Sequence, residues 1–191
     1  MTQKKTFEAL NSRSTLGAFY ANNILYPKLK KYLNGHVLDY GAGVGNFTKF
    51  YSNFGKITPA DINKRAVNTM SKDGLKPIII KKNFINVRDS FFDSAILDNV
   101  IEHIIKPFPV FKEVARVTKK NASILIGVPG IKGFKMHWDH KTFYDEYKLE
   151  KILHKHKMIV SKIFYMPLFK SEFLSKHMKS YCLYAVVKNK K

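Results

Sequence analysis

A glycine-rich turn that directly follows a short apolar strand constrains the fold of this chain more than any other feature. Residues 36–40 (HVLDY) are predicted to form the strand, and the turn runs from Gly41 to Gly45 as GAGVG. Glycines permit a tight turn and a close approach of a ligand to the backbone. A helix is predicted over residues 45–54, so the turn would lie at a helix N-terminus, where free N–H groups favour a carboxylate or a phosphate. The sequence therefore predicts a strand–turn–helix unit that binds a ligand.

Acidic residues near this turn narrow the kind of ligand. The turn has the form D-x-G-x-G-x-G, beginning at Asp39, and Asn46 stands where a dinucleotide-binding G-x-G-x-x-G turn has its last glycine. Asp39 suits a cationic ligand better than a pyrophosphate. Asp61 follows 22 residues after Asp39, at the end of the predicted second strand, where an acid can accept both hydroxyls of a ribose. The structural alternative for Asp61 is a cap for the helix predicted from Asn63.

Short strand-like runs alternate with helical stretches along most of the chain. Strands are predicted at residues 36–40, 56–61, 76–81, 92–98, 122–128, 158–165 and 181–188. Helices are predicted at residues 45–54 and 63–72, from Phe108 and from about Asp145, with no clear helix between the last two strands. Strand–helix alternation implies a parallel sheet covered on both faces. We therefore expect an α/β fold with a Rossmann-like, seven-stranded, mostly parallel sheet, helices on both faces and an antiparallel last strand in a single domain.

The N-terminal segment lies outside this alternation. Residues 1–35 are expected to form a helical lid segment, and residues 36–191 the Rossmann-like domain. In such sheets the ligand binds at the carboxyl ends of the strands, so the lid segment would cover that crevice. Arg13 and Tyr20 are candidates for ligand contacts there, with a surface arginine and a core tyrosine as the simpler alternative.

Three stretches of sequence resemble motifs of one enzyme family. VLDYGAGVGNF resembles the first motif of the class I S-adenosylmethionine-dependent methyltransferases, ITPADIN resembles their second-strand motif, and FDSAILDNVIEHI resembles their fourth strand and the following turn. The resemblance extends through almost the whole chain and implies S-adenosylmethionine as the cofactor. Asn83 stands where the family usually has an aspartate. The asparagine keeps a hydrogen-bonding group but lacks the negative charge. The cofactor-binding residues that the resemblance implies are Asp39, Gly41, Ala42, Gly43, Gly45, Asp61, Ile62, Asn83, Phe84, Asp98 and Asn99.

The overall likeness is greatest to the members that methylate small metabolites, sugars and quinone precursors. It implies a methyltransferase that transfers a methyl group to an O or N atom of a small-molecule acceptor, such as a sugar or another metabolite. A hydroxyl acceptor needs a base to remove its proton. His140 is the leading candidate because it follows the fifth strand in a polar segment, with His137 and Asp139 as nearby alternatives and His103 after the fourth strand. No metal site is expected, because the i, i+3 pair of His137 and His140 has no clear Cys, Glu or third His partner.

The net charge of +20 suggests a macromolecular alternative. An RNA or protein methyltransferase would dock its substrate through this basic surface. Only four of the 34 basic residues are arginine, however, and readers of nucleic acids favour the bidentate arginine fork. A solvated, lysine-rich surface is therefore the favoured interpretation.

Other features of the sequence bear on compartment and assembly. Cys182 is the only cysteine, which fits a reducing cytosol, and we expect it to lie in the last strand, away from the active site. The N-terminus lacks the apolar region of a signal peptide, and no apolar run reaches the length of a membrane span. We therefore expect a cytoplasmic protein, a monomer or a homodimer, with no membrane partner.

Overall fold

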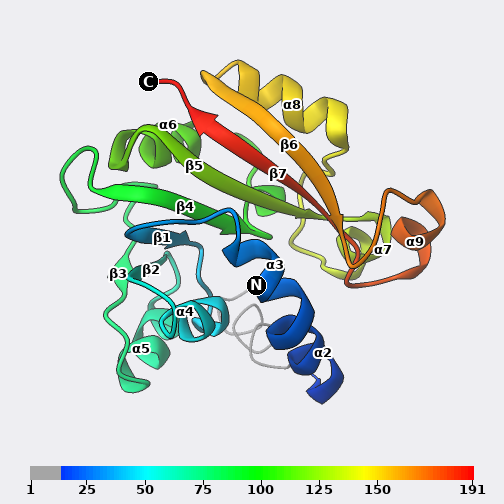
Figure 1. The fold of residues 1–191 in the computed structure, drawn as a ribbon, viewed down its shortest axis with the longest axis horizontal. Coiled ribbons are helices and arrows are strands. Elements are labelled where there is room, and N and C mark those ends of the chain that lie inside the picture. Colours follow the sequence, from blue (N-terminus) through cyan, green and yellow to red (C-terminus); the bar gives the residue numbers. More distant parts are fainter. Residues whose placement is uncertain (1–13) are drawn as a thin grey trace.

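The computed structural model of the chain describes residues 14–191 and contains one seven-stranded sheet, of order β3-β2-β1-β4-β5-β7-β6 (Figure 1). Strands β1 to β5 pair in parallel, and β7 is antiparallel to both of its neighbours. The predicted fold class is confirmed. The strands are β1 (Val37–Tyr40), β2 (Ile57–Asp61), β3 (Ile78–Ile79), β4 (Phe92–Asp98), β5 (Thr118–Pro129), β6 (Met158–Met166) and β7 (Cys182–Asn189).

Helices cover both faces of the sheet. Figure 1 shows α6 and α8 on one side, and α2, α3, α4 and α5 on the other. The N-terminal part comprises α2 (Thr15–Tyr20), the π-helical turn η1 (Ala21–Leu25) and α3 (Tyr26–Lys30). The remaining helices are α4 (Asn46–Tyr51), α5 (Lys64–Lys72), the 3-10 turn η2 (Ile101–His103), α6 (Phe108–Val117), α7 (Ile131–Met136), α8 (Glu146–His154) and α9 (Glu172–His177).

The elements differ from the predicted ones at a few places. Helices α7 and α9 were not predicted, and α9 lies between the last two strands, where the sequence shows no clear helix. Each has six residues, too few to display helical periodicity. They pack against each other, and the Ser171 hydroxyl caps α9 by accepting a hydrogen bond from the Leu174 N–H. Strand β3 is also shorter than predicted, because the chain turns from Lys81 to Phe84, which pair in an isolated bridge.

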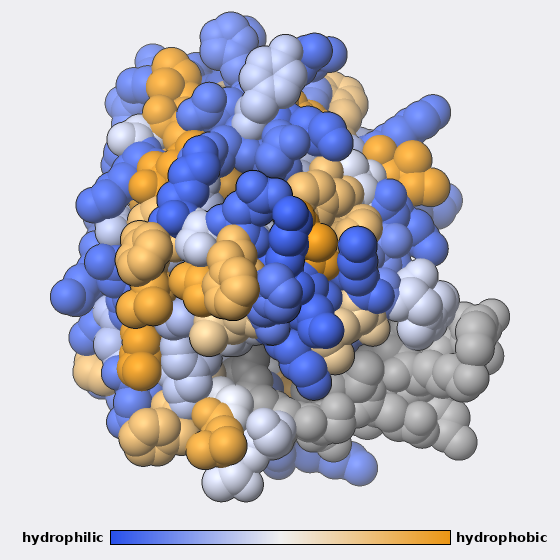
Figure 2. Space-filling view, turned by 90° about the vertical axis from the view of Figure 1, so that its right-hand side faces the viewer, coloured by the Kyte–Doolittle hydropathy of each residue, from blue (hydrophilic) through white to orange (hydrophobic). Residues whose placement is uncertain are grey.

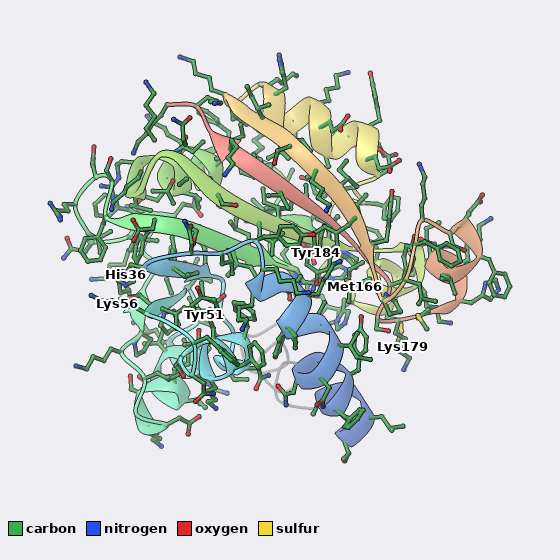
Figure 3. All side chains as sticks on the ribbon, in the orientation of Figure 1. His36, Tyr51, Lys56, Met166, Lys179 and Tyr184 are labelled. Carbon is green, nitrogen blue, oxygen red and sulfur yellow. The ribbon has the colours of Figure 1, made fainter. Side chains whose placement is uncertain are left out.

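Two hydrophobic clusters hold the layers together. One joins the sheet to α6 and α8 through side chains such as Phe111 and Leu149. The other joins it to α3 and α4, where Leu29 and Tyr184 are fully buried. Figure 3 places Tyr184 and Met166 at the junction between the sheet and the N-terminal helices. Helix α3 is therefore part of the core and does more than cover the edge of the sheet.

The carboxyl ends of the parallel strands meet at one edge of the sheet. Strand β7 begins at this same edge, because it is antiparallel and Cys182 lies opposite Pro129, the last residue of β5. Helices α7 and α9 also lie here, and Figure 2 views the molecule from this side, where hydrophobic and hydrophilic side chains are interspersed. Within residues 14–191, no helix is both long enough and apolar enough to cross a membrane.

Arg116 fastens the segment after β3 to α6. Its guanidinium donates to the backbone oxygens of Ile85 and Val87, both at 3.0 Å, and to both carboxylate oxygens of Glu113 at 2.7 and 2.8 Å. Glu113 in turn accepts the Ile85 N–H at 2.7 Å. The guanidinium carbon also lies 4.8 Å from the centre of the Phe84 ring. One planar side chain thus positions the turn that carries Asn83 and Phe84.

We expect Arg116→Lys to destabilise the protein by about 1–3 kcal/mol, because an ammonium cannot reproduce the planar fork of donors. The melting temperature should fall by several degrees, at about 2–4 °C per kcal/mol for a chain of this size. Differential scanning calorimetry measures the change, with Arg88→Lys at an exposed position as the control. Equal melting temperatures for the two variants would show that the network contributes nothing to stability.

Candidate functional site

The glycine turn after β1 has the backbone conformation that its sequence predicts. Gly41, Gly43 and Gly45 have φ angles of 79°, 57° and 79°, in the left-handed region that favours glycine. A Cβ atom on Gly41 would also lie 2.6 Å from Cγ2 of Val100. Val100 follows the end of β4, so glycine at position 41 lets the turns after β1 and β4 come into close contact.

Asp61 ties the glycine turn to the end of β2. One carboxylate oxygen accepts the Gly43 N–H at 2.8 Å, and the other accepts the Asn63 N–H at 2.7 Å. Asn63 itself caps α5 by accepting the Arg65 N–H at 2.9 Å, so the N-cap of that helix is Asn63 and not Asp61. Burial raises the pKa of Asp61. The carboxylate also accepts a hydrogen bond from the Ile62 N–H, so about one of its four lone-pair sites is left for a ligand.

Asp39 is a buried acid beneath the same turn. Its carboxylate accepts a hydrogen bond from the Thr48 hydroxyl at 2.6 Å. Burial raises its pKa from 3.8 to about 7; the Thr48 hydrogen bond opposes the shift, and the charges of Asp98 and Asp61 add to it. Asp39, Asp61 and Asp98 therefore form an acidic group at the ends of β1, β2 and β4, which favours a cationic ligand.

Asp98 lies within a polar network at the end of β4. Its Oδ1 atom accepts hydrogen bonds from the Tyr184 hydroxyl at 2.8 Å and from the Asn99 amide at 3.0 Å. The Cys182 thiol lies 3.9 Å from Oδ1 of Asn99. The expectation that Cys182 lies away from this site is wrong, because the antiparallel β7 begins at the carboxyl edge. Burial raises the pKa of the Cys182 thiol, which keeps it neutral and unsuited to act as a nucleophile.

Two of the candidate cofactor-binding residues have exposed apolar side chains. Ile62 is 61% exposed and Phe84 is 49% exposed. Asn83 has a φ of 67° in the left-handed region, which asparagine tolerates better than most residues. Strands β2 and β3 pair at Asp61 and Ile79, so the turn that carries Asn83 and Phe84 follows directly beside Asp61. The arrangement offers apolar surface next to an acid, as a nucleoside requires.

The three candidate histidines come together beyond Asp98. The ring centre of His140 lies 4.6 Å from that of His103 and 5.0 Å from that of His137. His103 lies in η2 after β4, and the other two lie in the segment after α7. Two backbone hydrogen bonds join these segments: the Glu102 carbonyl accepts the N–H groups of Lys141 and Thr142 at 2.7 and 3.1 Å. Residues 37 positions apart in the sequence thus form one cluster.

Two acidic residues complete this cluster: Asp139, an alternative base candidate from the sequence, and Glu102, which the sequence did not single out. Oε1 of Glu102 lies 3.9 Å from Nε2 of His140, and Oδ2 of Asp139 lies 3.0 Å from Nδ1 of His103. Burial raises the pKa of Glu102 to about 8 and lowers that of His140 to about 4. His140 is therefore neutral at pH 7. In the sequence, Glu102 is marked only as an acid next to a histidine after a strand end. This pattern becomes specific once His140 is known to lie beside Glu102.

The chain resembles known proteins in sequence and in fold. Residues 38–126 match the model of a family described as a methyltransferase domain. An uncharacterised protein of Methanocaldococcus jannaschii is 31% identical over 138 residues, which make up 68% of this chain and 65% of that protein. This chain therefore spans just under two thirds of the length of that relative.

Two solved structures share the fold at low sequence identity. A SAM-dependent methyltransferase from Aquifex aeolicus superposes with a TM-score of 0.72 at 19% identity, covering 99% of both chains. A possible histamine N-methyltransferase from Thermotoga maritima superposes with a TM-score of 0.75 at 16% identity, covering 99% of this chain and 98% of that one. At these identities the likeness establishes the fold.

We expect Asp39→Asn to change how the stability of the protein depends on pH. The pKa of Asp39 is higher in the folded state, about 7, than its ordinary value of 3.8, so the folded state binds the proton more tightly. The stability that this proton provides is present at low pH and is lost as the pH rises from about 4 to about 7. The variant lacks this loss. The difference in stability, taken as the unfolding free energy of the variant minus that of the native protein, should therefore be about 2–3 kcal/mol larger at pH 8 than at pH 5.

Urea denaturation at the two pH values measures this difference. Asp73→Asn, at an exposed position, controls for the loss of one carboxylate. A difference between Asp39→Asn and the native protein that is the same at pH 5 and pH 8 would contradict the prediction.

Proposed function

Because this chain carries a methyltransferase domain on the class I methyltransferase fold, we propose that it transfers a methyl group from S-adenosylmethionine to an O or N atom of a small-molecule acceptor, such as a sugar or another metabolite. One observation carries this proposal. The glycine turn, Asp61 and the histidine cluster all lie at one edge of the sheet, joined by the contact of the turn with Val100. A cofactor and an acceptor bound there would be neighbours.

The chemistry of the site fits this cofactor. Asp61 lies at the end of the second strand, where an acid can bind a ribose, and about one lone-pair site of its carboxylate is left for a ribose hydroxyl. Ile62 and Phe84 offer apolar surface for the adenine ring, and the acids Asp39 and Asp98 favour a positively charged ligand. S-adenosylmethionine supplies a methyl group that is already activated on a sulfonium, so the protein mainly has to align the reactants and exclude water.

The N-terminal segment is proposed to cover this edge. The Tyr20 hydroxyl is buried with no hydrogen-bond partner. Burial raises its pKa, and the charges of Cys182 and Asp98 raise it further, which indicates that the hydroxyl faces the acidic group at the strand ends. The described part of this segment, residues 14–35, would then contribute both to the core and to a lid. Arg13, the other candidate in this segment, lies outside the described residues.

The histidine cluster is proposed to serve the acceptor. A hydroxyl must lose its proton as it is methylated, and His103, His137 and His140 are the groups beside Asp98 that can assist. Beyond the N-terminal segment, the chain between Pro129 and Tyr144 is the main part left to recognise an acceptor. Such a short segment favours a compact substrate over a macromolecule.

We expect Asp61→Asn to weaken S-adenosylmethionine binding by about 10- to 100-fold, the cost of one to two hydrogen bonds to a charged group. The asparagine keeps one carbonyl oxygen as an acceptor for the turn, so the fold should be retained. Calorimetric titration measures binding to the native protein, to Asp61→Asn and to the control Asp73→Asn. A folded native protein that does not bind S-adenosylmethionine, or that binds NAD tightly, would exclude the proposal.

The macromolecular alternative makes a different prediction. A methyltransferase that docks RNA through its lysines would lose affinity steeply with salt, because phosphate contacts release counterions. We expect instead that RNA binding, measured by fluorescence anisotropy with a labelled oligonucleotide, stays weak at 150 mM salt, with a dissociation constant of about 1 µM or weaker. Binding tighter than about 10 nM at that salt concentration would favour the RNA alternative.

A further inference from the structure

In the described part of the chain, Glu102 is the buried acid with the fewest hydrogen bonds and opposite charges around it. Its side chain is 0% exposed, and neither carboxylate oxygen accepts a hydrogen bond from another residue. The charges of Asp98 and Asp139, which act on it, are also negative. Within residues 14–191, its one ion-pair contact is Nε2 of His140 at 3.9 Å, which is too long for a hydrogen bond. A carboxyl group buried in this way either keeps its proton or, when it is ionised, needs a cation beside it.

Two histidines present nitrogen atoms to this carboxylate. One ligand atom each from Glu102, His103 and His140 lies within 4.8 Å of the others. Two ligands at about 2.1 Å from a shared ion lie about 3–4.2 Å apart for bond angles from 90° to 180°. The distance of 3.9 Å between Glu102 and His140 lies within this range. The 4.8 Å limit for all three atoms is slightly above it, so the ligand nitrogen of His103 has to lie, or move, within about 4.2 Å of the other two for one ion to bind all three.

The hydrogen bonds around these histidines select the nitrogen that is free to bind a metal. Nδ1 of His140 lies 2.9 Å from the backbone oxygen of Phe134, and Nδ1 of His103 lies 3.0 Å from a carboxylate oxygen of Asp139. Both partners are acceptors, so each Nδ1 carries a proton and each Nε2 carries a lone pair. Metal-binding histidines are oriented in the same way, by a carboxylate or a backbone carbonyl on the second nitrogen.

We propose that Glu102, His103 and His140 together bind a divalent transition-metal ion. Two imidazoles and one carboxylate form a ligand set that zinc, iron and related ions accept, and three protein ligands leave positions open for a substrate. The spacing of the histidines in the sequence does not reveal this metal site, because η2 and the segment after α7 supply the ligands separately.

The site would also define the acceptor, and this part rests on the proposed function. Glu102, the first residue of the cluster, lies two residues after Val100, which contacts the glycine turn. An ion there binds a hydroxyl of the acceptor and lowers its pKa, so that the hydroxyl releases its proton to water and becomes a nucleophilic oxygen. The acceptor class is then a small molecule with a hydroxyl group that can ligate a metal.

Cobalt and zinc binding test the site directly. The untagged full-length protein is stripped with a chelator, and Co²⁺ is added while the visible absorption is recorded, with Zn²⁺ affinity measured by calorimetry. We expect one ion per chain and a loss of affinity of at least about 100-fold in Glu102→Gln and in His140→Ala. The double variant His154→Ala/His177→Ala, which removes two exposed histidines, should bind like the native protein.

The stability of the metal-free variant distinguishes a ligand from a structural acid. Glu102→Gln replaces a buried carboxylate that has no partner, so its melting temperature without metal should equal or exceed that of the native protein. No saturable binding by the folded native protein would overturn the proposal, as would binding that survives both substitutions or a marked fall in the melting temperature of metal-free Glu102→Gln. S-adenosylmethionine binding is titrated separately without metal, so failure of the metal site and failure of the proposed function give different results.

Discussion

The pairing of β1 between β2 and β4 is the constraint on which the rest of the structure depends. Parallel pairing brings the carboxyl ends of the three strands to one edge, and each end carries an acid: Asp39, Asp61 and Asp98. The hydrogen bond from the Gly43 N–H to Asp61 then closes the turn after β1 onto β2. The contact of Gly41 with Val100 brings the turn after β4 to the same place. The site is thus a direct consequence of strand order.

Two buried glutamates show how structural and functional acids differ in this protein. Both carboxylate oxygens of Glu113 are bound by Arg116, and one also accepts the Ile85 N–H. Glu113 therefore stabilises the turn after β3. Glu102 is more deeply buried and has no such partner. An acid kept in that state lowers stability unless it binds something, which is why we assign it to the function of the protein rather than to its fold.

The part of the site that we propose binds the acceptor is built differently from the part that we propose binds the cofactor. The proposed cofactor side uses residues next to strand ends, whose positions follow from the sheet. The histidine cluster instead combines η2 with the segment after α7, and the hydrogen bonds of the Glu102 carbonyl to Lys141 and Thr142 hold the two together. Such a construction allows the acceptor groups to vary while the cofactor groups stay in place, in keeping with the general tendency of α/β folds to host many functions.

The sequence by itself determined the fold class, the glycine turn and the place of Asp61 at a strand end, because each depends on local signals: strand alternation, left-handed glycines and a fixed spacing between two strand ends. It also selected all three histidines of the cluster. Tertiary structure alone decided that Cys182 lies beside Asn99, since this depends on β7 running antiparallel. It alone placed Glu102 against His140, and it formed α7 and α9, which are too short for periodicity to reveal. Contacts between segments distant in the chain depend on packing, and one sequence carries no local signal for them.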